Sequence, residues 1–460
     1  MRRAAAVSAL LLAGCAGTPS VSGVRGASPS PETPWTPPAD AIPRVAPADT
    51  SARAAIPPDL ADRIRRLTLT EIVDLGLRNN PITRLAWANA QAAASVYGSE
   101  RGAWLPTIDA EVNASRLKTA ASQGRTAVEQ SVLTPSVTLN YLLFDFGGRS
   151  GRVAGARQRL LAASFVHNAA IQDVVLQVQV AYFRYPANRN LLDAQRTTLE
   201  EARTNLTAAE ERRRVGLATI ADVLQARTAA SQARLELETI EGNVQTTRGA
   251  LALALGLPAN LPYDVDSSAA AAPVAPLADS VNAIIATALQ GRPDLAATQA
   301  EVEAAGAGIS EARAGLLPSL GFSATGGRTY ATTIPDGANS YTLSLGLTIP
   351  LFSGFSRQYD LRAAEFEAEA ARARAQSLRQ EVVFQVFSAY YALQTATRRV
   401  RTADDLLAAQ TALAGARAQL VDARLAWSVS LAQLAHDAGV LDPRGGSPLR
   451  LTQDTTSTPR

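Results

Sequence analysis

Residues 341–352 read YTLSLGLTIPLF, and apolar and polar side chains alternate along this stretch. The apolar set (Tyr341, Leu343, Leu345, Leu347, Ile349 and Leu351) alternates with a polar or small set (Thr342, Ser344, Gly346 and Thr348). Successive side chains of a β-strand point to opposite faces, so the pattern predicts a strand with one apolar and one polar face. About ten such residues are also typical of a barrel strand with lipid on one side and water on the other. The weaker alternation of SLGFSAT (319–325) predicts its hairpin partner.

The same arrangement occurs earlier in the chain. TIDAEVNA (107–114) and SVTLNYL (136–142) also alternate and predict a first hairpin. Markers around the first hairpin recur around the second. Pro81 and Pro106 recur at one constant offset as Pro293 and Pro318, and Phe144 and AYF (181–183) recur at a slightly smaller constant offset as Phe352 and AYY (389–391). Recurrence at nearly constant offsets indicates a duplicated chain with two repeats.

Four strands are too few to close a membrane barrel, because such barrels begin at eight strands. Strands would have to be pooled between chains: two copies would give eight strands and three copies would give twelve. The alternative is an amphipathic hairpin on a soluble protein. The sequence predicts no other sheet that the hairpins could join, which favours the pooled barrel.

A long helical pattern follows each predicted hairpin. From Arg149 to about Val215 only Pro186 interrupts it, and roughly 66 residues of helix would extend about 100 Å. Apolar residues recur at helical spacing in IQDVVLQVQVAY (171–182) and again in VVFQVFSAYY (382–391). Most other positions are alanine-rich, which allows helices to approach closely. The predicted fold class is mixed α and β, with two repeats that each contain a β-hairpin and long coiled-coil helices.

The chain begins MRRAAAVSALLLAGCAG, with two arginines and a short apolar run that is too short to span a bilayer. These features predict a secretory signal peptide over residues 1–14. The single cysteine, Cys15, lies in LAGC, which resembles the bacterial lipobox and predicts cleavage before Cys15 and its acylation; the alternative is a chance cysteine. Ala16 follows instead of the aspartate that retains lipoproteins at the inner membrane in enteric bacteria, which favours the outer membrane.

Composition argues against an enzyme. The chain has 460 residues, 47% hydrophobic and 5% aromatic, with a formal net charge of +3. One cysteine excludes an intramolecular disulfide, and the two histidines, His167 and His436, are interpreted as polar residues on helix surfaces. No nucleophile motif, phosphate loop or metal motif is present, so we predict no catalytic residue, cofactor or metal. Basic residues do not cluster with aromatic ones, so nucleic acid is not an expected partner.

These features together resemble the outer membrane factors of Gram-negative bacteria, the TolC, OprM and NodT-type efflux proteins. The most specific elements are LTLTEIVDLGLRNNP (67–81), LFDFGGR (143–149), LFSGFSR (351–357) and VGLATIADVLQA (215–226). The resemblance implies a homotrimer whose twelve-stranded β-barrel is continued by a periplasmic α-barrel. It implies a passive tunnel that is loaded by an inner-membrane efflux transporter through a periplasmic membrane-fusion adaptor protein.

The resemblance also implies site residues. VGLAT-type segments form the turn between two long helices at the periplasmic tip, where the adaptor docks, and the matching contact residues are Val215, Gly216, Leu217 and Thr219. Gly216 permits the turn, and Asp222 suits the first turn of the next helix. Family members narrow the tunnel with aspartates just after the second tip, so Asp222 and Asp405 are the predicted pore aperture.

The second repeat lacks a counterpart of that turn. Gly256 matches Gly439, as Asp222 would match Asp405, but these pairs lie closer together in the sequence than the earlier markers do. About 25 residues, close to seven helical turns, are therefore absent from the second repeat. A shortfall shared between both arms would shorten each by about 12 residues, or roughly 18 Å. We expect RTADD (401–405) to form the turn with Thr402 as a cap. The sequence leaves open whether the shortening is natural or marks a faulty gene.

The predicted organisation is a signal peptide (1–14), a lipidated Pro-rich tether (15–66), a first repeat (67–257) with a helix, a strand pair and a long helical hairpin, a linker (258–276), a second repeat with a shortened hairpin (277–440) and a disordered tail (441–460). The predicted function is a passive outer-membrane exit channel of a tripartite efflux system for small molecules, anchored in outer membrane lipid and extending into the periplasm. The alternatives are a non-channel periplasmic coiled-coil lipoprotein and a channel impaired by its missing second tip.

Overall fold

The structure is a computed structural model that describes residues 68–119, 128–260, 274–275, 277–332, 334–409, 413–441 and 449. All of them belong to one compact unit, residues 56–460. The predicted signal peptide, Cys15 and the tether lie outside the described residues, as does nearly all of the predicted tail.

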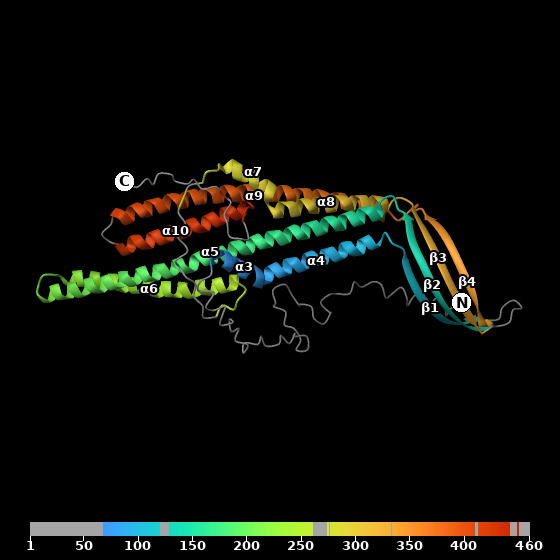
Figure 1. Ribbon diagram of the computed structural model, residues 1–460, viewed down its shortest axis with the longest axis horizontal. Helices are drawn as coiled ribbons and strands as arrows, with labels where there is room; N and C mark the ends of the chain where they lie inside the picture. The colour runs from blue at the N-terminus through green and yellow to red at the C-terminus, as the bar shows by residue number, and fades with distance from the viewer. Residues whose placement is uncertain are drawn as a thin grey trace, which may run out of the picture. The chain divides into compact units, whose positions relative to one another are not determined.

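The order of elements repeats once along the chain (Figure 1). The first repeat contains α3 (Leu69–Asn79), α4 (Pro81–Gly102), β1 (Thr107–Thr119), β2 (Val128–Phe144), α5 (Gly148–Arg214) and α6 (Ile220–Ala254). The second contains α7 (Val281–Gly291), α8 (Pro293–Ala314), β3 (Ser319–Ala331), β4 (Ile334–Thr348), α9 (Ser356–Ala409) and α10 (Leu413–Asp437). Corresponding elements have equal lengths up to the hairpins: 11 residues in α3 and α7, 22 in α4 and α8, and 13 in β1 and β3. The predicted duplication is therefore confirmed.

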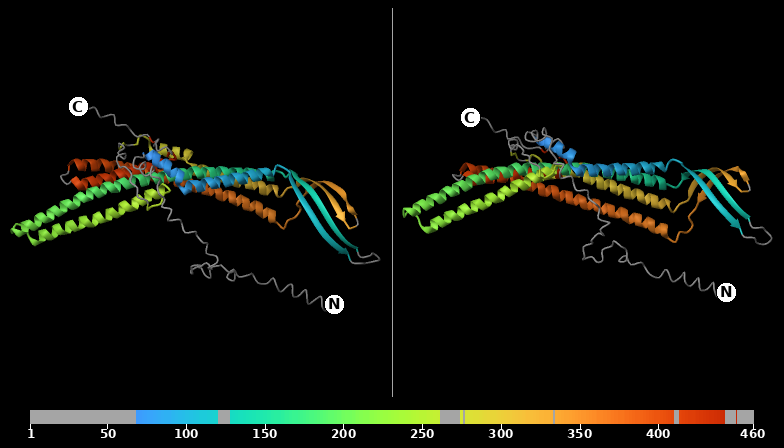
Figure 2. Two further views of the ribbon diagram at one scale, coloured as in Figure 1. Left: turned by 60° about the horizontal axis from the view of Figure 1, so that its bottom comes forward. Right: turned by 90° about the horizontal axis from the view of Figure 1, so that it is seen from below.

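The four strands form one antiparallel sheet in the order β1-β2-β3-β4. Both predicted hairpins are present, with Thr107 opposite Asn140 and Ser319 opposite Thr348, and β2 joins β3 across the repeats. The sheet lies at one end of the helices (Figure 2). Tyr341 is 84% exposed and Leu343 is 67% exposed, so nothing in the described chain covers the apolar face of β4.

Helix α5 is the centre of the helical part, because α4, α6, α8 and α10 all pack along it. There are two apolar cores: one lies along α5 around Val174, Val178 and Leu251, and the other lies between α7, α9 and α10 around Val382 and Leu393. Full burial of each such side chain stabilises the fold by about 1.5–3 kcal/mol. Small residues bring the helices close together. A Cβ on Gly151 of α5 would lie 2.9 Å from the backbone nitrogen of Glu311 in α8, which leaves no room for a side chain.

The turn from the sheet into each long helix contains a phenylalanine in the left-handed region. Phe146 has φ 51° beside Gly147, and Phe355 has φ 66° beside Gly354. Few residues other than glycine adopt this conformation. Ring contacts accompany it, since the Phe144 and Phe146 centroids lie 4.7 Å apart.

An arginine shortly after this phenylalanine ties each turn to the helix before the sheet. Arg149 is buried and donates to the carbonyls of Ala103 (3.2 Å) and Leu142 (2.8 Å), and its guanidinium lies 3.9 Å from the centroid of the Trp104 ring. Arg357 donates to the Gly315 carbonyl at the equivalent place. The final arginines of LFDFGGR and LFSGFSR therefore fix the angle between the strands and the helices.

In the described part of the chain, no helix combines the length and the apolar character needed to cross a membrane.

Candidate channel tip and hairpin roots

The turn between α5 and α6, residues 215–219, is the first tip. Gly216 has φ 78°, and the Leu217 N–H donates to the Arg212 carbonyl at 2.8 Å, which closes the end of α5. Thr219 caps α6: its hydroxyl accepts from the Asp222 N–H at 3.3 Å, and the Asp222 carboxylate accepts from the Thr219 N–H at 2.7 Å. The predicted glycine turn and the acid of the first helical turn are thus both present.

The first tip presents apolar side chains to its surroundings. Val215 is 58% exposed, Leu217 78% and Ile220 51%. Hydrogen bonds from the Thr219 backbone and hydroxyl lower the pKa of the exposed Asp222 carboxyl, so it carries a charge at neutral pH. The first tip is therefore a small exposed apolar surface beside the charged Asp222 carboxylate, which suits contact with another protein.

The second tip is not where the sequence placed it. Helix α9 continues to Ala409 and α10 begins at Leu413, so the second tip falls between these two helices. Thr402 does not cap a helix, because its hydroxyl donates to the Arg398 carbonyl one turn back. Residues 401–405 (RTADD) lie inside α9, so the prediction that they form the turn is wrong. Asp405 therefore lies before the second tip and not just after it.

The prediction failed because it placed the turn just before Asp405, whereas α9 continues to Ala409 and both arms of the hairpin are shorter. In the arm that leads to the tip, α5 continues from Tyr182 to Arg214, but α9 continues from the matching Tyr390 only to Ala409. In the arm that returns, α6 has 35 residues and α10 has 25. The first arm is therefore shorter by about 13 residues and the second by about 10, roughly three helical turns each. This division agrees with the predicted sharing.

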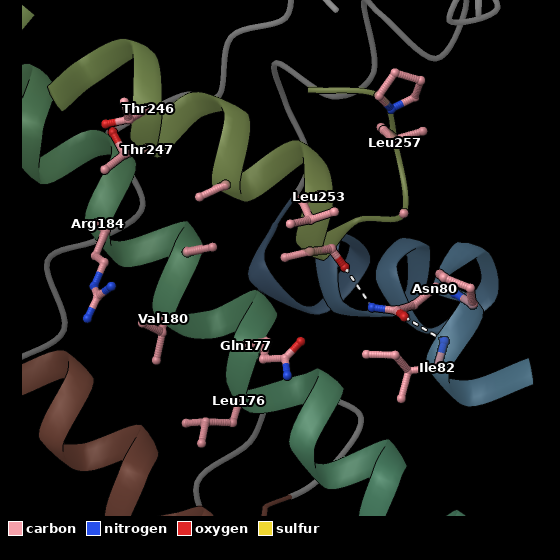
Figure 3. Close-up of a pocket in the computed structure, with 16 residues that line it drawn as sticks. Asn80, Ile82, Leu176, Gln177, Val180, Arg184, Thr246, Thr247, Leu253 and Leu257 are labelled. Atoms are coloured by element: carbon pink, nitrogen blue, oxygen red, sulfur yellow. Dashed lines mark hydrogen bonds between the residues drawn. The ribbon is translucent and has the colours of Figure 1, made fainter. Parts of the chain in front are cut away.

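At the opposite end, which we call the root, each hairpin is fixed to the helix pair before the sheet. Asn80 precedes α4, and its amide donates to the Ala254 carbonyl at 3.3 Å (Figure 3). Arg292 precedes α8 at the equivalent position and donates to the Asp437 carbonyl at 3.2 Å and to Gln385 Oε1 at 2.8 Å.

Arg292 also forms a two-pronged ion pair with Asp294, with distances of 3.0 and 2.6 Å. Burial alone would raise the pKa of the Asp294 carboxyl, but the Arg292 hydrogen bonds and charge lower it. The second root therefore holds a partly buried ion pair where the first root holds an amide.

A glycine follows each returning helix, Gly256 after α6 and Gly439 after α10, and allows the close contacts at the root. Gly256 has φ 69° and Gly439 has φ 70°. A Cβ on Gly256 would lie 2.6 Å from the Asn79 carbonyl oxygen, and one on Gly439 would lie 2.9 Å from the Arg292 side chain. Both the backbone conformation and the space require glycine at these positions.

His436, in the last turn of α10, links the second hairpin to α5. Its Nε2 lies 2.8 Å from Asp173 Oδ1 and its Nδ1 lies 3.0 Å from Asp437 Oδ1. Burial by itself lowers the pKa of His436, but the hydrogen bonds and charges of both aspartates outweigh it and raise the pKa to about 9. The interpretation of His436 as a surface residue is wrong, because it is a charged clamp with a side chain only 16% exposed.

A hollow of about 920 Å³ lies at the first root, between α5, α6 and the start of α4 (Figure 3). Its lining is mostly apolar and includes Ile82, Leu176, Val180 and Leu253, with Gln177 and Arg184 among the polar residues. Among the described residues there is no group of three or more His, Cys, Asp or Glu side chains able to hold a metal ion. The features that the described residues do present at this end are an apolar hollow and the two hairpin roots.

Sequence reasoning missed the root residues. The signal for Asn80 and Arg292 was their shared place immediately before the repeated prolines. For His436 the signal was the adjacent Asp437 at the end of a predicted helix. That neighbour alone could not identify Asp173 as the second partner.

Comparisons with known proteins agree with this architecture. The family described as "Outer membrane efflux protein" matches residues 72–257 and 284–406. Protein CyaE of Bordetella pertussis is 30% identical over 345 residues, which cover 74% of this chain and 72% of CyaE. Outer membrane protein OprJ of Pseudomonas aeruginosa is 28% identical over 342 residues, covering 72% of this chain and 70% of OprJ. The MtrE outer membrane channel of Neisseria gonorrhoeae, in its open state, shares the fold with a TM-score of 0.63 at 20% identity, covering 84% of this chain and 90% of that chain.

Proposed function

This chain belongs to the outer membrane efflux protein family and is an outer-membrane exit channel for efflux, and from this premise we propose that three copies form one passive tunnel. The family forms homotrimeric channels that work with adaptor and inner-membrane pump partners. Three sheets of four strands would give a barrel of twelve strands, continued by the helices into the periplasm. The known members of the family are efflux channels.

The two unpaired edges of the sheet support this proposal most directly. In the described chain, β1 and β4 each have a strand neighbour on one side only. Unpaired backbone groups are costly inside a bilayer, so a sheet that enters the membrane must close on itself. Pairing β4 of one copy with β1 of the next would close it, and the exposed apolar face of β4 would meet lipid.

Extraction and gel mobility test the proposal. Membranes that contain the chain are washed with high salt and then with alkaline carbonate, and the detergent extract is run on gels with and without heating. We expect the chain to resist both washes and to migrate as a trimer that heating converts to monomer. Release by salt alone would contradict the barrel and favour a peripheral lipoprotein.

We further propose that the first tip receives a periplasmic adaptor, which connects the channel to an inner-membrane transporter. The exposure of Val215 and Leu217 supports this, together with the turn at Gly216 and the cap at Thr219, which hold them at the end of the hairpin. The aperture role of Asp222 and Asp405 stays a prediction. Asp222 has its carboxylate engaged in the cap, and Asp405 lies before the second tip.

Cys15 is the proposed lipid anchor, followed by the tether that ends near residue 66. A Cys15→Ser variant tests this with radiolabelled palmitate. We expect label in the wild-type chain and none in the variant, and equal labelling of both would contradict the anchor.

A further inference from the structure

The two roots differ beside a glutamine that both repeats contain. Asn80 and Gln177 line the hollow at the first root, and their counterparts in the second repeat are Arg292 and Gln385. In the second root, the long Arg292 side chain donates to Gln385 Oε1 at 2.8 Å. In the first root, the shorter Asn80 side chain donates to the Ala254 carbonyl instead, and no described residue bonds to the Gln177 amide. The first repeat therefore keeps a hollow and a free amide where the second has a hydrogen-bonded network.

The lining of the hollow is apolar at positions where the second root is charged. Ile82 and Leu253 line the hollow and are 43% and 72% exposed. Their counterparts in the second repeat are Asp294 and His436, which both form ion pairs. Val180 of α5 adds a further aliphatic side chain (Figure 3). At about 920 Å³ the hollow lies within the size range of small-molecule sites, roughly 300–1,000 Å³.

A guanidinium group accompanies this apolar lining. Arg184 of α5 lines the hollow one helical turn beyond Val180 (Figure 3). Within the described ranges no carboxylate pairs with Arg184, and its counterpart in the second repeat is Ala392. A guanidinium stays charged in proteins and binds oxyanions such as carboxylates and phosphates. Charge complementarity therefore favours a ligand with an anionic group, and the lining favours an apolar body.

The hollow lies on the side of α5 that faces away from α3. Val175 and Val178 of α5 pack with Ile72 of α3 in the first core. At 3.6 residues per turn, Val180 and Arg184 project about 170° around α5 from those two valines. Helix α3 directly follows the predicted tether, which leads to lipid outside any tunnel. The α3 side is then the outer side of the wall, and the hollow faces the interior of the proposed tunnel.

We propose that each copy binds an amphipathic organic anion in this hollow, on the lumen side of the first root, and that such anions are among the exported small molecules. The apolar body lies against Ile82, Val180 and Leu253, and the anionic group accepts hydrogen bonds from Arg184 and Gln177. The hollow is open on one side, which keeps binding weak enough for release, as passage through a channel requires. The proposal rests on the proposed tunnel and adds a substrate class.

Binding of naphthalene-2-sulfonate to the full chain in lipid nanodiscs tests the ligand class by isothermal titration calorimetry. A naphthyl-trimethylammonium cation is the control ligand, because it has the same apolar body and the opposite charge. We expect the wild type to bind the anion about tenfold more tightly than the cation, and Arg184→Gln to lose this preference. Val180→Trp fills the hollow and should weaken binding of the anion. Arg196→Gln, at another exposed arginine of α5, is the matched control and should bind as the wild type does.

Thiol labelling in planar lipid bilayers tests which side of the wall the hollow faces. Gln177→Cys is treated with a bulky methanethiosulfonate, and we expect a lower single-channel conductance because the label enters the lumen. Thr70→Cys, at an exposed position of α3, is the matched control and should leave the conductance unchanged. The wild-type chain, treated in the same way, controls for Cys15.

An anion preference that Arg184→Gln loses and Arg196→Gln keeps, together with a conductance that falls only for labelled Gln177→Cys, supports the proposal. Trimers that conduct but show no saturable binding of the anion, or no preference for it over the cation, overturn the proposal and leave the tunnel standing. So do unchanged anion binding in Arg184→Gln or Val180→Trp and equal conductance changes at the two labelled cysteines. A chain that forms neither trimers nor channels overturns both.

Discussion

The two repeats of this chain follow one plan and differ at both ends of their helical hairpins. The first has long arms, a glycine turn and an apolar root at Leu253, with Asn80 as its polar anchor. The second has shorter arms and a root held by the charges of Arg292 and His436. The charged root is packed against α5 within the chain, whereas Leu253 at the apolar root is exposed. A hairpin can thus be shortened by about three helical turns in each arm and keep its root.

The largest difference in stability between the repeats should appear when the root residues Arg292 and Asn80 are each replaced by alanine. Arg292→Ala leaves Asp294 without its partner in a partly buried site, and we expect a loss of about 3 kcal/mol in the free energy of unfolding, the low end of the range for a broken buried ion pair. Asn80→Ala removes a neutral cap and hydrogen bond and should cost about 1–2 kcal/mol. Urea titrations followed by circular dichroism measure both. Equal losses would contradict a difference between the roots.

The double variant Arg292→Ala, Asp294→Ala separates charge from packing. It removes both charges, so it should recover part of the stability lost in Arg292→Ala. No recovery would mean that the Arg292 hydrogen bonds to Gln385 and the Asp437 carbonyl dominate.

His436 should make the second root sensitive to pH. Its folded pKa of about 9 lies above the ordinary value of 6.5, so its stabilising contribution is complete below pH 6.5 and is lost as the pH rises through 9. The shift corresponds to at most about 3 kcal/mol. The stability of the wild type should fall between pH 6.5 and about 9 by more than that of His436→Gln. Parallel pH profiles for the two proteins would contradict the clamp.

The sequence predicted the repeats, both hairpins and the first tip, because each rests on a local pattern: period-two alternation, paired prolines, and a glycine next to a threonine cap. It failed where the answer depended on distant packing. The shortfall in the second hairpin was visible, but placing it required knowing that α9 and α10 pair along their length through Val400 and Trp427. His436 looked solvated because Asp173 lies 263 positions away.

A smaller effect is expected at the first tip. Thr219→Ala removes the cap of α6, and we expect a loss of about 1 kcal/mol. Thr402→Ala is its matched control, because that hydroxyl only bonds back along α9. The control should change stability by less than about 0.5 kcal/mol. Similar losses in both variants would contradict the assignment of Thr219, and not Thr402, as the cap.

The central claim is that this exit channel meets its adaptor through the first tip, and resistance measured in the native host lacking the wild-type gene tests it most directly. The Leu217→Asp variant places a charge on the exposed apolar surface of the first tip. Leu235→Asp changes an exposed leucine within α6, away from the tip, and is the matched control. Both should remain trimeric in the outer membrane. We predict that wild type and Leu235→Asp restore resistance to a panel of antibiotics and dyes, and that Leu217→Asp does not. Full resistance with Leu217→Asp would contradict the claim.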